Sequence, residues 1–381
     1  MRITGSSINR GYTMSEEIYL DAPNVGELEK KYVNEAIDAG FVSTVGPFVA
    51  DFETKFSSYM GEAKAVSTQS GTAALHLALL RLGIGDEDEV ILPVMTFIAT
   101  ANPVTYVGAC PVFADVDADT WNITPETIEP LITERTKAII PVHMYGNPCD
   151  MDGIMRLADK HGLAVIEDST ESLGGTYKGK MTGTFGTFGC FSFNGNKVIT
   201  TGGGGMIVGN DAEEMMRIKS LANQARAIDG SDNYSEIGFN YRMTNIEAAI
   251  GLAQMEKLED FLKTKRRFNE IYHNELAGME RVRFQRHYEG AVSSCWLTAA
   301  IFDKVRDIDA FQRGLKARRV VTRKLFMPIV NFRPYRDHGK GGYPNANALY
   351  SKGLCLPSST LNDEEQIIFA CKNIKGLLES A

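Results

Sequence analysis

Residues 189–206 read GCFSFNGNKVITTGGGGM, and they place a single lysine, Lys197, between a serine and a run of glycines. The serine is Ser192, and the four consecutive glycines occupy 202–205. Two apolar residues follow the lysine, and desolvation lowers the pKa of a lysine, which makes it a better nucleophile. Glycines let the backbone approach a ligand closely. The stretch therefore predicts a lysine presented to the carbonyl group of a cofactor, although this pattern alone is more often a solvated lysine in a surface loop.

The length and composition are those of a globular protein with two domains, or with one large α/β unit and an appendage. The chain has 381 residues, of which 44% are hydrophobic and 23% are charged. Its net charge of −8 argues against a general nucleic-acid-binding surface, which is basic, so we expect no nucleic-acid partner. Two basic clusters are expected to be solvated, and the second is the better candidate for contacting a substrate phosphate: Lys263, Lys265, Arg266 and Arg267, and Arg318, Arg319, Arg323 and Lys324.

The six cysteines lie apart in the sequence, and none belongs to a CxxC pair. A disulfide framework and a metal site are therefore not expected, and the pattern is typical of a protein in the reducing cytoplasm. The first residues, MRITGSSINRGYTM, lack the apolar core of a signal peptide. We expect 1–19 to be a flexible segment, with Met14 as an alternative start.

One stretch, residues 90–114, contains no charged side chain and is long enough to test as a membrane helix. However, Pro93, Pro103 and Pro111 interrupt it. Because proline breaks a helix, the stretch predicts a buried strand, a loop, a short helix and a second buried strand. We therefore expect no membrane-spanning segment.

Apolar runs and helical patterns alternate from residue 26 to residue 169. Expected helices cover 26–39, 48–60, 73–83, 98–107, 125–134 and 151–161, and expected strands cover 63–67, 89–94, 110–116, 137–146 and 163–169. Continuous apolar strands that alternate with helices are typical of an α/β fold with a mostly parallel sheet covered on both faces. Parallel crossovers are right-handed, so the loops that begin at 68, 93 and 168 are expected to meet at one edge of the sheet.

A long helix separates the two halves of the chain. It is predicted to begin with Thr244 or Asn245 as its N-cap, with Glu247 close behind. Its length suits a link between a large domain at 20–265 and a smaller α+β domain at 266–381.

Four separate positions suggest a cofactor site. Residues 70–73 start a helix, whose unpaired N–H groups and partial positive charge suit a phosphate group, although plain capping is an equally good interpretation. Asp168 ends an apolar strand, where a carboxylate can keep a pyridine nitrogen protonated, or can simply make a structural hydrogen bond. A pyridoxal phosphate (PLP) site requires an aspartate at a strand end and a lysine in a glycine-flanked stretch, and Asp168 and Lys197 have this arrangement. Ser192 adds a phosphate donor. Phe97 follows another strand end and can stack on a pyridine ring, although such a phenylalanine is more often part of the core.

Six motifs in order resemble the DegT-type family of PLP-dependent nucleotide-sugar aminotransferases. They are SGTAAL (70–75), PVMTF (93–97), EDSTES (167–172), FSFNGNK (191–197), TTGGGGM (200–206) and GFNYRMTN (238–245). The resemblance extends from about residue 20 to the C-terminus and includes GLCLPSS (353–359). It implies the PLP-dependent transferase fold type I, which is the aspartate aminotransferase fold, and a homodimer with shared active sites.

Carried over position by position, the resemblance implies a role for each residue of the site. Lys197 binds PLP covalently and then moves the proton between the cofactor and the substrate carbon. Asp168 pairs with the pyridine nitrogen, and Phe97 stacks on the ring. Glu171 lies near the ring hydroxyl, at a position where many relatives have Gln or His. The phosphate group is expected to contact Gly71, Thr72, Ala73 and Ser192, together with Asn240 of the partner subunit.

The implied reaction is the transamination of a nucleotide-linked keto sugar. Glutamate donates the amino group and converts the cofactor to pyridoxamine phosphate (PMP), which then aminates the sugar. Some relatives have His in place of the lysine and dehydrate the sugar, and Lys197 argues against that reaction. A regulator or sensor without catalytic activity is a further alternative, and the complete cofactor set argues against it.

The expected sugar is a UDP-2-acetamido-2,6-dideoxy-4-keto-hexose that is aminated at C4. The motifs GNK and EDSTES and the segment LANQAR (221–226) most resemble the aminotransferases of bacillosamine and legionaminic acid synthesis. A C4 aminotransferase of the GDP-perosamine synthase type is the alternative. The segments 41–47, 143–147 and 323–335 are expected to line the substrate, and His143 is interpreted as a structural residue at a strand end.

Overall fold

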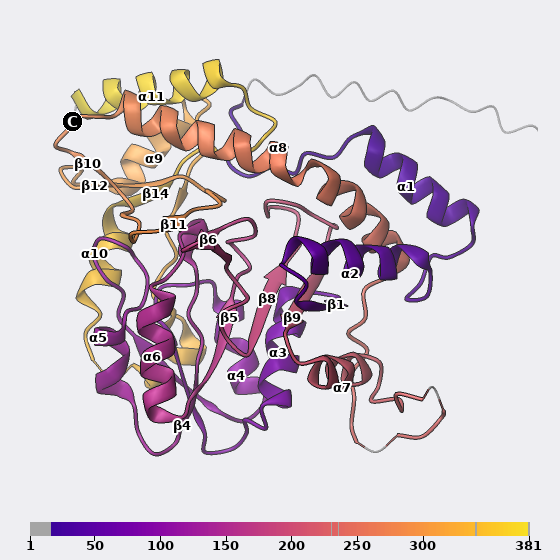
Figure 1. Ribbon diagram of the computed structural model, residues 1–381. Coiled ribbons are helices and arrows are strands. Elements are labelled where there is room, and N and C mark those ends of the chain that lie inside the picture. The colour runs from indigo at the N-terminus through magenta and orange to yellow at the C-terminus, as the bar shows by residue number, and fades with distance from the viewer. Residues whose placement is uncertain (1–16, 230, 235, 340, 380–381) are drawn as a thin grey trace, which may run out of the picture.

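The computed structural model describes residues 17–229, 231–234, 236–339 and 341–379. Its main feature is a seven-stranded sheet (Figure 1). In spatial order the strands are β1 (Lys64–Thr68), β9 (Gly205–Gly209), β8 (Phe188–Ser192), β5 (Ala164–Asp168), β4 (Thr136–Ile139), β2 (Glu89–Pro93) and β3 (Cys110–Ala114). The neighbouring pairs from β8 to β3 are parallel, whereas β9 runs antiparallel to both β1 and β8. The prediction of a mostly parallel α/β sheet is therefore confirmed.

Helices precede, connect and follow these strands. They are α1 (Glu27–Asp38), α2 (Pro47–Tyr59), α3 (Gly71–Arg81), α4 (Asn102–Tyr106), α5 (Pro125–Ile128), α6 (Met151–His161) and α7 (Ala212–Ala222). Helix α3 packs against β5, β8 and β9, and α6 packs against β5. Because α3 is apolar on nearly every side, it is almost completely buried.

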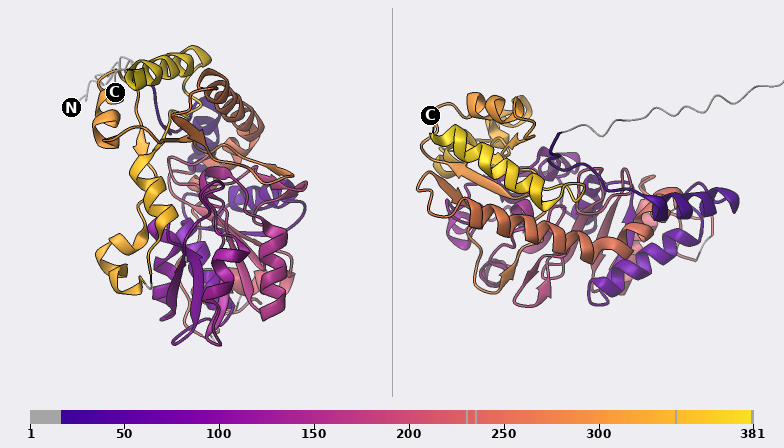
Figure 2. Two further views of the ribbon diagram at one scale, coloured as in Figure 1. Left: turned by 90° about the vertical axis from the view of Figure 1, so that its left-hand side faces the viewer. Right: turned by 90° about the horizontal axis from the view of Figure 1, so that it is seen from above.

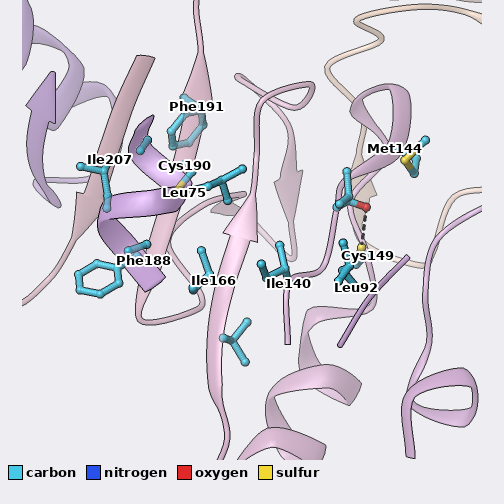
Figure 3. Close-up of a cluster of buried hydrophobic side chains, with 14 of the residues drawn as sticks. Leu75, Leu92, Ile140, Met144, Cys149, Ile166, Phe188, Cys190, Phe191 and Ile207 are labelled. Atoms are coloured by element: carbon cyan, nitrogen blue, oxygen red, sulfur yellow. Dashed lines mark hydrogen bonds between the residues drawn. The ribbon is translucent and has the colours of Figure 1, made fainter. Parts of the chain in front are cut away.

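The strands and α3 share one large apolar core, which Figure 3 shows in part. Ile166 of β5 and Ile207 of β9 belong to it, together with Leu75 of α3. The Sγ of Cys149 donates a hydrogen bond of 3.2 Å to the backbone oxygen of Val142, beyond the end of β4. The apolar runs that predict strands are thus the residues that fill this core.

The charge-free stretch 90–114 folds as expected, into β2, the 3-10 helix η1 (Ile98–Thr100), α4 and β3. Two other elements are shorter than predicted. The expected helix 125–134 is α5 followed by the 3-10 turn η2 (Glu129–Leu131), because Pro130 cannot continue an α-helix. The expected strand 137–146 ends with β4 at Ile139, because Pro141 has no N–H to donate.

Among the residues that the structure describes, no helix has the length and apolarity needed to cross a membrane.

The long helix α8 (Asn245–Glu275) begins where the sequence predicts it. Thr244 is the N-cap: its hydroxyl accepts a hydrogen bond from the Glu247 N–H at 3.3 Å, and the Glu247 carboxylate accepts one from the Thr244 N–H at 2.8 Å. Helices α1 and α2 lie along the first part of α8, and α11 (Glu364–Glu379) lies along its last part (Figures 1 and 2). The helix therefore connects the two halves of the chain.

The C-terminal part has its own sheet and its own core. A four-stranded sheet consists of β10 (Val282–Phe284), β12 (Ala299–Phe302), β14 (Gly353–Cys355) and β13 (Arg323–Lys324), and the helices are α9 (Ile308–Lys316), α10 (Pro344–Lys352) and α11. A small sheet joins β11 (Ala291–Val292) to β6 (Thr176–Tyr177) and β7 (Lys180–Met181), and short 3-10 turns occur at η3 (Met144–Gly146), η4 (Ile329–Asn331) and η5 (Arg333–His338). Phe268 and Ile271 of α8 belong to the second core, whereas Trp296 and Leu325 of the C-terminal part belong to the large core.

Most of the expected flexible segment 1–19, with Met14, lies outside the described residues. Its last part is anchored: Ile18 is buried and pairs with Val320, and the Tyr19 N–H donates to Asn362 Oδ1 at 2.9 Å. The expectation of flexibility is therefore wrong for these residues, because Ile18 packs in the second core.

The basic cluster at 263–267 is only partly solvated, so that prediction is wrong for two of its members. Lys265 is 4% exposed, and its Nζ donates to the backbone oxygens of Trp296 at 3.1 Å and Ser358 at 2.8 Å. Arg266 donates to Ser293 O at 3.1 Å and to Gly174 O. Lys265 is thus buried and Arg266 half-buried, and the carbonyl partners explain how these cations are tolerated there.

Candidate active site

A cavity of about 600 Å³ lies where the loops after β1, β2 and β5 meet. The expectation that these loops gather at one edge of the sheet is therefore confirmed. The large sheet and its loops contribute Ser70, Gly71, Thr72, Phe97, Thr100, Asp168, Thr170, Glu171, Ser192 and Lys197. The C-terminal part contributes Trp296, Arg323, Lys324, Phe326, Phe332 and Tyr350. The volume is that of a site for a small molecule.

Asp168 lies at the end of β5 and is 2% exposed. Its Oδ2 accepts a hydrogen bond of 2.7 Å from the Thr100 hydroxyl, and its Oδ1 accepts one of 3.2 Å from the Thr170 N–H. A carboxylate has about four acceptor positions, so these two bonds leave it able to accept another hydrogen bond from a group in the cavity. The neighbouring strand holds the backbone, because the Asp168 N–H donates to Pro141 O at 2.9 Å.

Lys197 reaches the same cavity from the loop after β8. Its Nζ lies 4.2 Å from the centroid of the Trp296 ring. Burial lowers the pKa of Lys197, whereas the nearby carboxylates of Glu171 and Asp168 raise it, and burial is the larger effect. A larger fraction of this amine is therefore neutral and nucleophilic than for an exposed lysine.

Glu171 is a second buried carboxyl group of the site, with 2% exposure. Its Oε2 accepts a hydrogen bond of 2.7 Å from the Tyr145 N–H. Burial raises the pKa of Glu171 to about 7, although Lys197 and the Tyr145 bond act in the opposite direction. This side chain therefore changes between a hydrogen-bond donor and a pure acceptor near neutral pH.

The start of α3 lies directly against the end of β8. A Cβ at Gly71 would fall 2.9 Å from Ser192 Cβ and 3.1 Å from Thr170 Cγ2, so only glycine permits this approach. The Ser70 hydroxyl caps the helix by accepting from the Ala73 N–H at 3.1 Å. Capping thus occupies the Ala73 N–H, whereas Gly71, Thr72 and Ser192 line the cavity.

The remaining site residues differ in their position. Phe97 is 56% exposed and lines the cavity, so the core position that its local sequence suggests is wrong. Asn240 is exposed and does not line this cavity, and its backbone pairs with Asn223 at the end of α7. Of the three segments expected to line the substrate, only 323–335 contributes to the cavity.

His143 is a structural residue, as its position at a strand end indicates. It is fully buried; its Nδ1 accepts a hydrogen bond of 3.1 Å from the Cys149 N–H, and its Nε2 lies 3.1 Å from Glu167 Oε2. Since Nδ1 accepts, the proton of the neutral ring is on Nε2, which donates to Glu167.

The sequence does not single out Thr100 or Trp296, although both contact the central residues of the site. Thr100 lies in the charge-free stretch, where one threonine among several has no distinguishing pattern. Trp296 follows α8 in the sequence, about a hundred residues after Lys197, and no local pattern connects the two. Within the described ranges, no group of three or more His, Cys, Asp or Glu side chains is placed to hold a metal ion.

Comparisons with known proteins connect this site with sugar amination. Residues 23–375 match the DegT/DnrJ/EryC1/StrS aminotransferase family. The chain is 40% identical over 352 residues to the GDP-perosamine synthase of Escherichia coli O157:H7, with 92% of this chain and 96% of the relative covered. Spr1654 from Streptococcus pneumoniae, solved in its PLP form, superimposes with a TM-score of 0.91 at 28% identity, covering 96% of this chain and 99% of Spr1654. Helicobacter pylori PseC, an aminotransferase of pseudoaminic acid biosynthesis, does so with a TM-score of 0.90 at 26% identity, covering 96% of this chain and 100% of PseC.

The residues of the cavity fit PLP. The ring nitrogen of PLP needs a buried carboxylate with free acceptor capacity, and the aldehyde needs an amine of lowered pKa. The ring face needs an accessible aromatic side chain, and the phosphate needs a helix start, which here lies beside a serine. The family match covers nearly the whole chain, and the relatives share both fold and cofactor. The chain belongs to the DegT/DnrJ/EryC1/StrS aminotransferase family and is a PLP-dependent sugar aminotransferase.

Proposed function

We propose that the protein transfers the amino group of glutamate to C4 of a nucleotide-linked 4-keto-6-deoxy sugar. The observation that carries the proposal is that Lys197, Asp168 and the start of α3 line one cavity, although they come from distant parts of the sequence. A family member without catalytic activity would have no need to keep a half-buried lysine beside two buried carboxyl groups.

Each residue then has a defined task. PLP, when bound, supplies an electron sink for the negative charge that develops on the substrate carbon. Asp168 accepts the hydrogen bond of the ring nitrogen and keeps that nitrogen protonated. The Lys197 amine would hold the cofactor and, when free, would carry a proton on Nζ between the cofactor and the substrate carbon. Phe97 covers one face of the ring, which excludes water from it.

The phosphate of the cofactor is assigned to Gly71, Thr72 and Ser192. The N-terminus of α3 offers backbone N–H groups and partial positive charge, and the two hydroxyls add donors. The exposed position of Asn240, outside the cavity of its own subunit, supports a homodimer in which this residue completes the phosphate site of the partner subunit.

Two cations at the mouth of the cavity support an anionic substrate. Arg323 lies 3.3 Å from Asp21 Oδ2, whereas its buried Nη2 has no hydrogen-bond partner among the described residues. Lys324 lines the cavity beside it and contacts Asp309 at 3.2 Å. We assign this pair to the diphosphate of the nucleotide or the carboxylates of glutamate, because charge-assisted bonds to such groups are strong.

The nucleotide is proposed to be GDP, with a 4-keto-6-deoxy sugar of the perosamine type. The GDP-perosamine synthase of Escherichia coli O157:H7 is 40% identical to this chain, whereas PseC is 26% identical. The UDP-2-acetamido-2,6-dideoxy-4-keto-hexose is the second candidate, and the GNK, EDSTES and LANQAR motifs favour it. We also propose that the enzyme works in the cytoplasm, which the six free cysteines fit.

The decisive experiment gives the purified enzyme glutamate and one 4-keto sugar at a time, linked to GDP or to UDP. We expect 2-oxoglutarate to form together with an amino sugar, which mass spectrometry identifies, and we expect the higher kcat/KM for the GDP-linked sugar. A higher value for the UDP-linked sugar would select the second candidate. If PLP-loaded enzyme forms no amino sugar from either the GDP-linked or the UDP-linked sugar, the proposal is contradicted.

A further inference from the structure

Trp296 covers the amine of Lys197. The Lys197 Nζ lies over the indole ring, 4.2 Å from its centroid, which is close for a cation–π contact. Trp296 is 1% exposed and Lys197 is half-buried, so the ring side of the contact is shielded from water, and such shielding strengthens the attraction between a cation and a ring face. The contact joins the C-terminal part of the chain to the residue that we assign to the chemistry.

Several contacts fix the orientation of the Trp296 ring. Its Nε1–H donates to the backbone oxygen of Asn196 at 2.6 Å, directly beside Lys197 in the sequence. Tyr145 stacks on it at 6.3 Å with planes 19° apart, and Phe326 stacks on Tyr145 at 5.4 Å with planes 6° apart. The Trp296 backbone oxygen accepts the bond from buried Lys265. The ring therefore has little freedom to turn away from the lysine.

The backbone on both sides of this stack is held in a strained conformation. Tyr145 has a φ of 55° and Cys295, which precedes Trp296, has a φ of 52°. Residues other than glycine rarely adopt such values, and they persist where the surrounding contacts enforce them, often at functional sites. At Gly146 a Cβ would lie 3.0 Å from the Trp296 N, so these two segments are packed as closely as backbone allows.

We propose that Trp296 is a positioning residue for Lys197: its indole face holds the lysine ammonium beside the cavity in the stages when the lysine is not bound to the cofactor. This inference rests on the proposed function of Lys197. The ring keeps the ammonium in place without forming a salt bridge, so the carboxylates of Asp168 and Glu171 stay available for their own partners. A carboxylate in place of the ring would bind the protonated amine of Lys197 so firmly that the amine could not give up its proton.

Four charged groups besides the ring act on the lysine. Glu171, Asp168 and Asp21 raise the pKa of Lys197, and Arg323, whose guanidinium carbon lies 5.9 Å from the same indole ring, lowers it. An experiment must therefore change the π face of Trp296 and leave these charges and the volume of the ring unchanged. Fluorinated tryptophan does this, because fluorine withdraws electron density from the face while the shape of the indole is nearly preserved.

The experiment replaces tryptophan biosynthetically with mono-, di- and trifluorotryptophan in the full-length enzyme. The chain has two tryptophans, so the substitution affects only Trp296 and Trp121. With the enzyme in its PMP form, which leaves Lys197 free, the rate of acetylation of the Lys197 peptide is measured against pH by mass spectrometry. We expect the pKa of Lys197 to fall stepwise with each fluorine, by about one unit in total.

The matched control repeats the series in Trp296→Phe, where only Trp121 is fluorinated. There we expect one pKa of Lys197, below that of the parent enzyme and independent of fluorination. A pKa that stays constant across the series in the parent enzyme overturns the proposal, as does an equal fall in the Trp296→Phe series. Borohydride reduction of the PLP-loaded enzyme tests the proposed function separately. A pyridoxyl group on another lysine would overturn the role of Lys197 and this inference with it. A pyridoxyl group on Lys197, together with a pKa of Lys197 that stays constant across the fluorinated series, would overturn only the inference.

Discussion

Thr100 donates a hydrogen bond of 2.7 Å to the carboxylate of Asp168 and thereby connects η1 with the end of β5. Thr100 in turn lies 3.0 Å from the Thr96 hydroxyl, so a short chain of hydroxyls leads to the buried acid. The bond fixes the carboxylate on one side while its remaining acceptor positions face the cavity. The orientation of Asp168 is thus set by a residue of a different strand connection.

Replacing this donor should impair the enzyme without unfolding it. We expect Thr100→Val to lower kcat about 10-fold, because a hydrogen bond to a charged group is lost from a buried carboxylate. Asp168→Asn should lower kcat at least about 100-fold, because the charge itself is removed. Steady-state kinetics with saturating PLP measure both, and Thr105→Val, which alters an exposed threonine of α4, is the control. Equal activity of Thr100→Val and Thr105→Val would contradict the assigned role.

The lysine itself should be dispensable for folding. We expect Lys197→Ala to keep the thermal midpoint and the circular dichroism of the parent but to lose transamination by on the order of 1000-fold. The absorbance band of lysine-bound PLP should be absent, and glutamate should not change the spectrum of the added cofactor. Lys263→Ala, at an exposed position of α8, should behave as the parent enzyme. Full activity of Lys197→Ala would remove the central assignment.

Glu171 should make the stability of the cofactor-free protein depend on pH. Its pKa is about 7 in the folded protein and 4.5 ordinarily, so the folded state binds the extra proton between these values. The contribution of this group is therefore fully present below pH 4.5 and is lost as the pH rises through 7.

The corresponding measurement compares the parent with Glu171→Gln from pH 4.5 to pH 8. We expect the free energy of unfolding of the parent to fall by roughly 3 kcal/mol more than that of Glu171→Gln across this window. Urea titrations at each pH provide the values. Parallel curves for the two proteins would show that Glu171 keeps an ordinary pKa.

Gly71 should be sensitive to the smallest substitution. A methyl group there meets Ser192 Cβ at 2.9 Å, so Gly71→Ala should push the start of α3 away from β8 and weaken PLP binding about 10-fold, at a cost of about 1–3 kcal/mol in stability. Gly195 lies in the lysine loop, and a methyl group added to it would meet nothing within 4 Å, which makes Gly195→Ala the matched control. Fluorescence titration with PLP distinguishes them, and equal affinities would contradict the close packing of α3 on β8.

Glu167 should be the most sensitive structural carboxylate. It accepts hydrogen bonds from three backbone N–H groups, those of Gly183, Phe185 and Gly186 at 2.7, 2.6 and 2.7 Å, and from the ring of His143. We expect Glu167→Gln to destabilise the protein by about 3 kcal/mol, because the amide presents a donor where only acceptors fit. Glu129→Gln, which breaks an exposed ion pair with Lys160, should leave the urea midpoint unchanged. The idea fails if the two variants unfold at the same urea concentration.

The sequence by itself determined the periodic and local features of this protein. Apolar runs predicted the parallel strands, because buried strands need apolar side chains on both faces. The capping box at Thr244 and Glu247 predicted the start of α8, because both partners lie within one helical turn. Asp168 was recognisable because it ends an apolar strand, and Lys197 because it lies in a glycine-flanked stretch; the motifs around both are specific to a family.

Only the tertiary structure decided which distant groups act on these residues. Trp296 lies over Lys197, Thr100 bonds to Asp168, and the basic residue Lys265 is buried against the backbone of Trp296. None of these contacts has a local pattern, because each joins segments whose approach depends on the packing of the sheet, α8 and the C-terminal part. The pKa of Glu171 follows the same rule: burial, which depends on the whole fold, moves it to about 7, whereas the residue type alone gives 4.5.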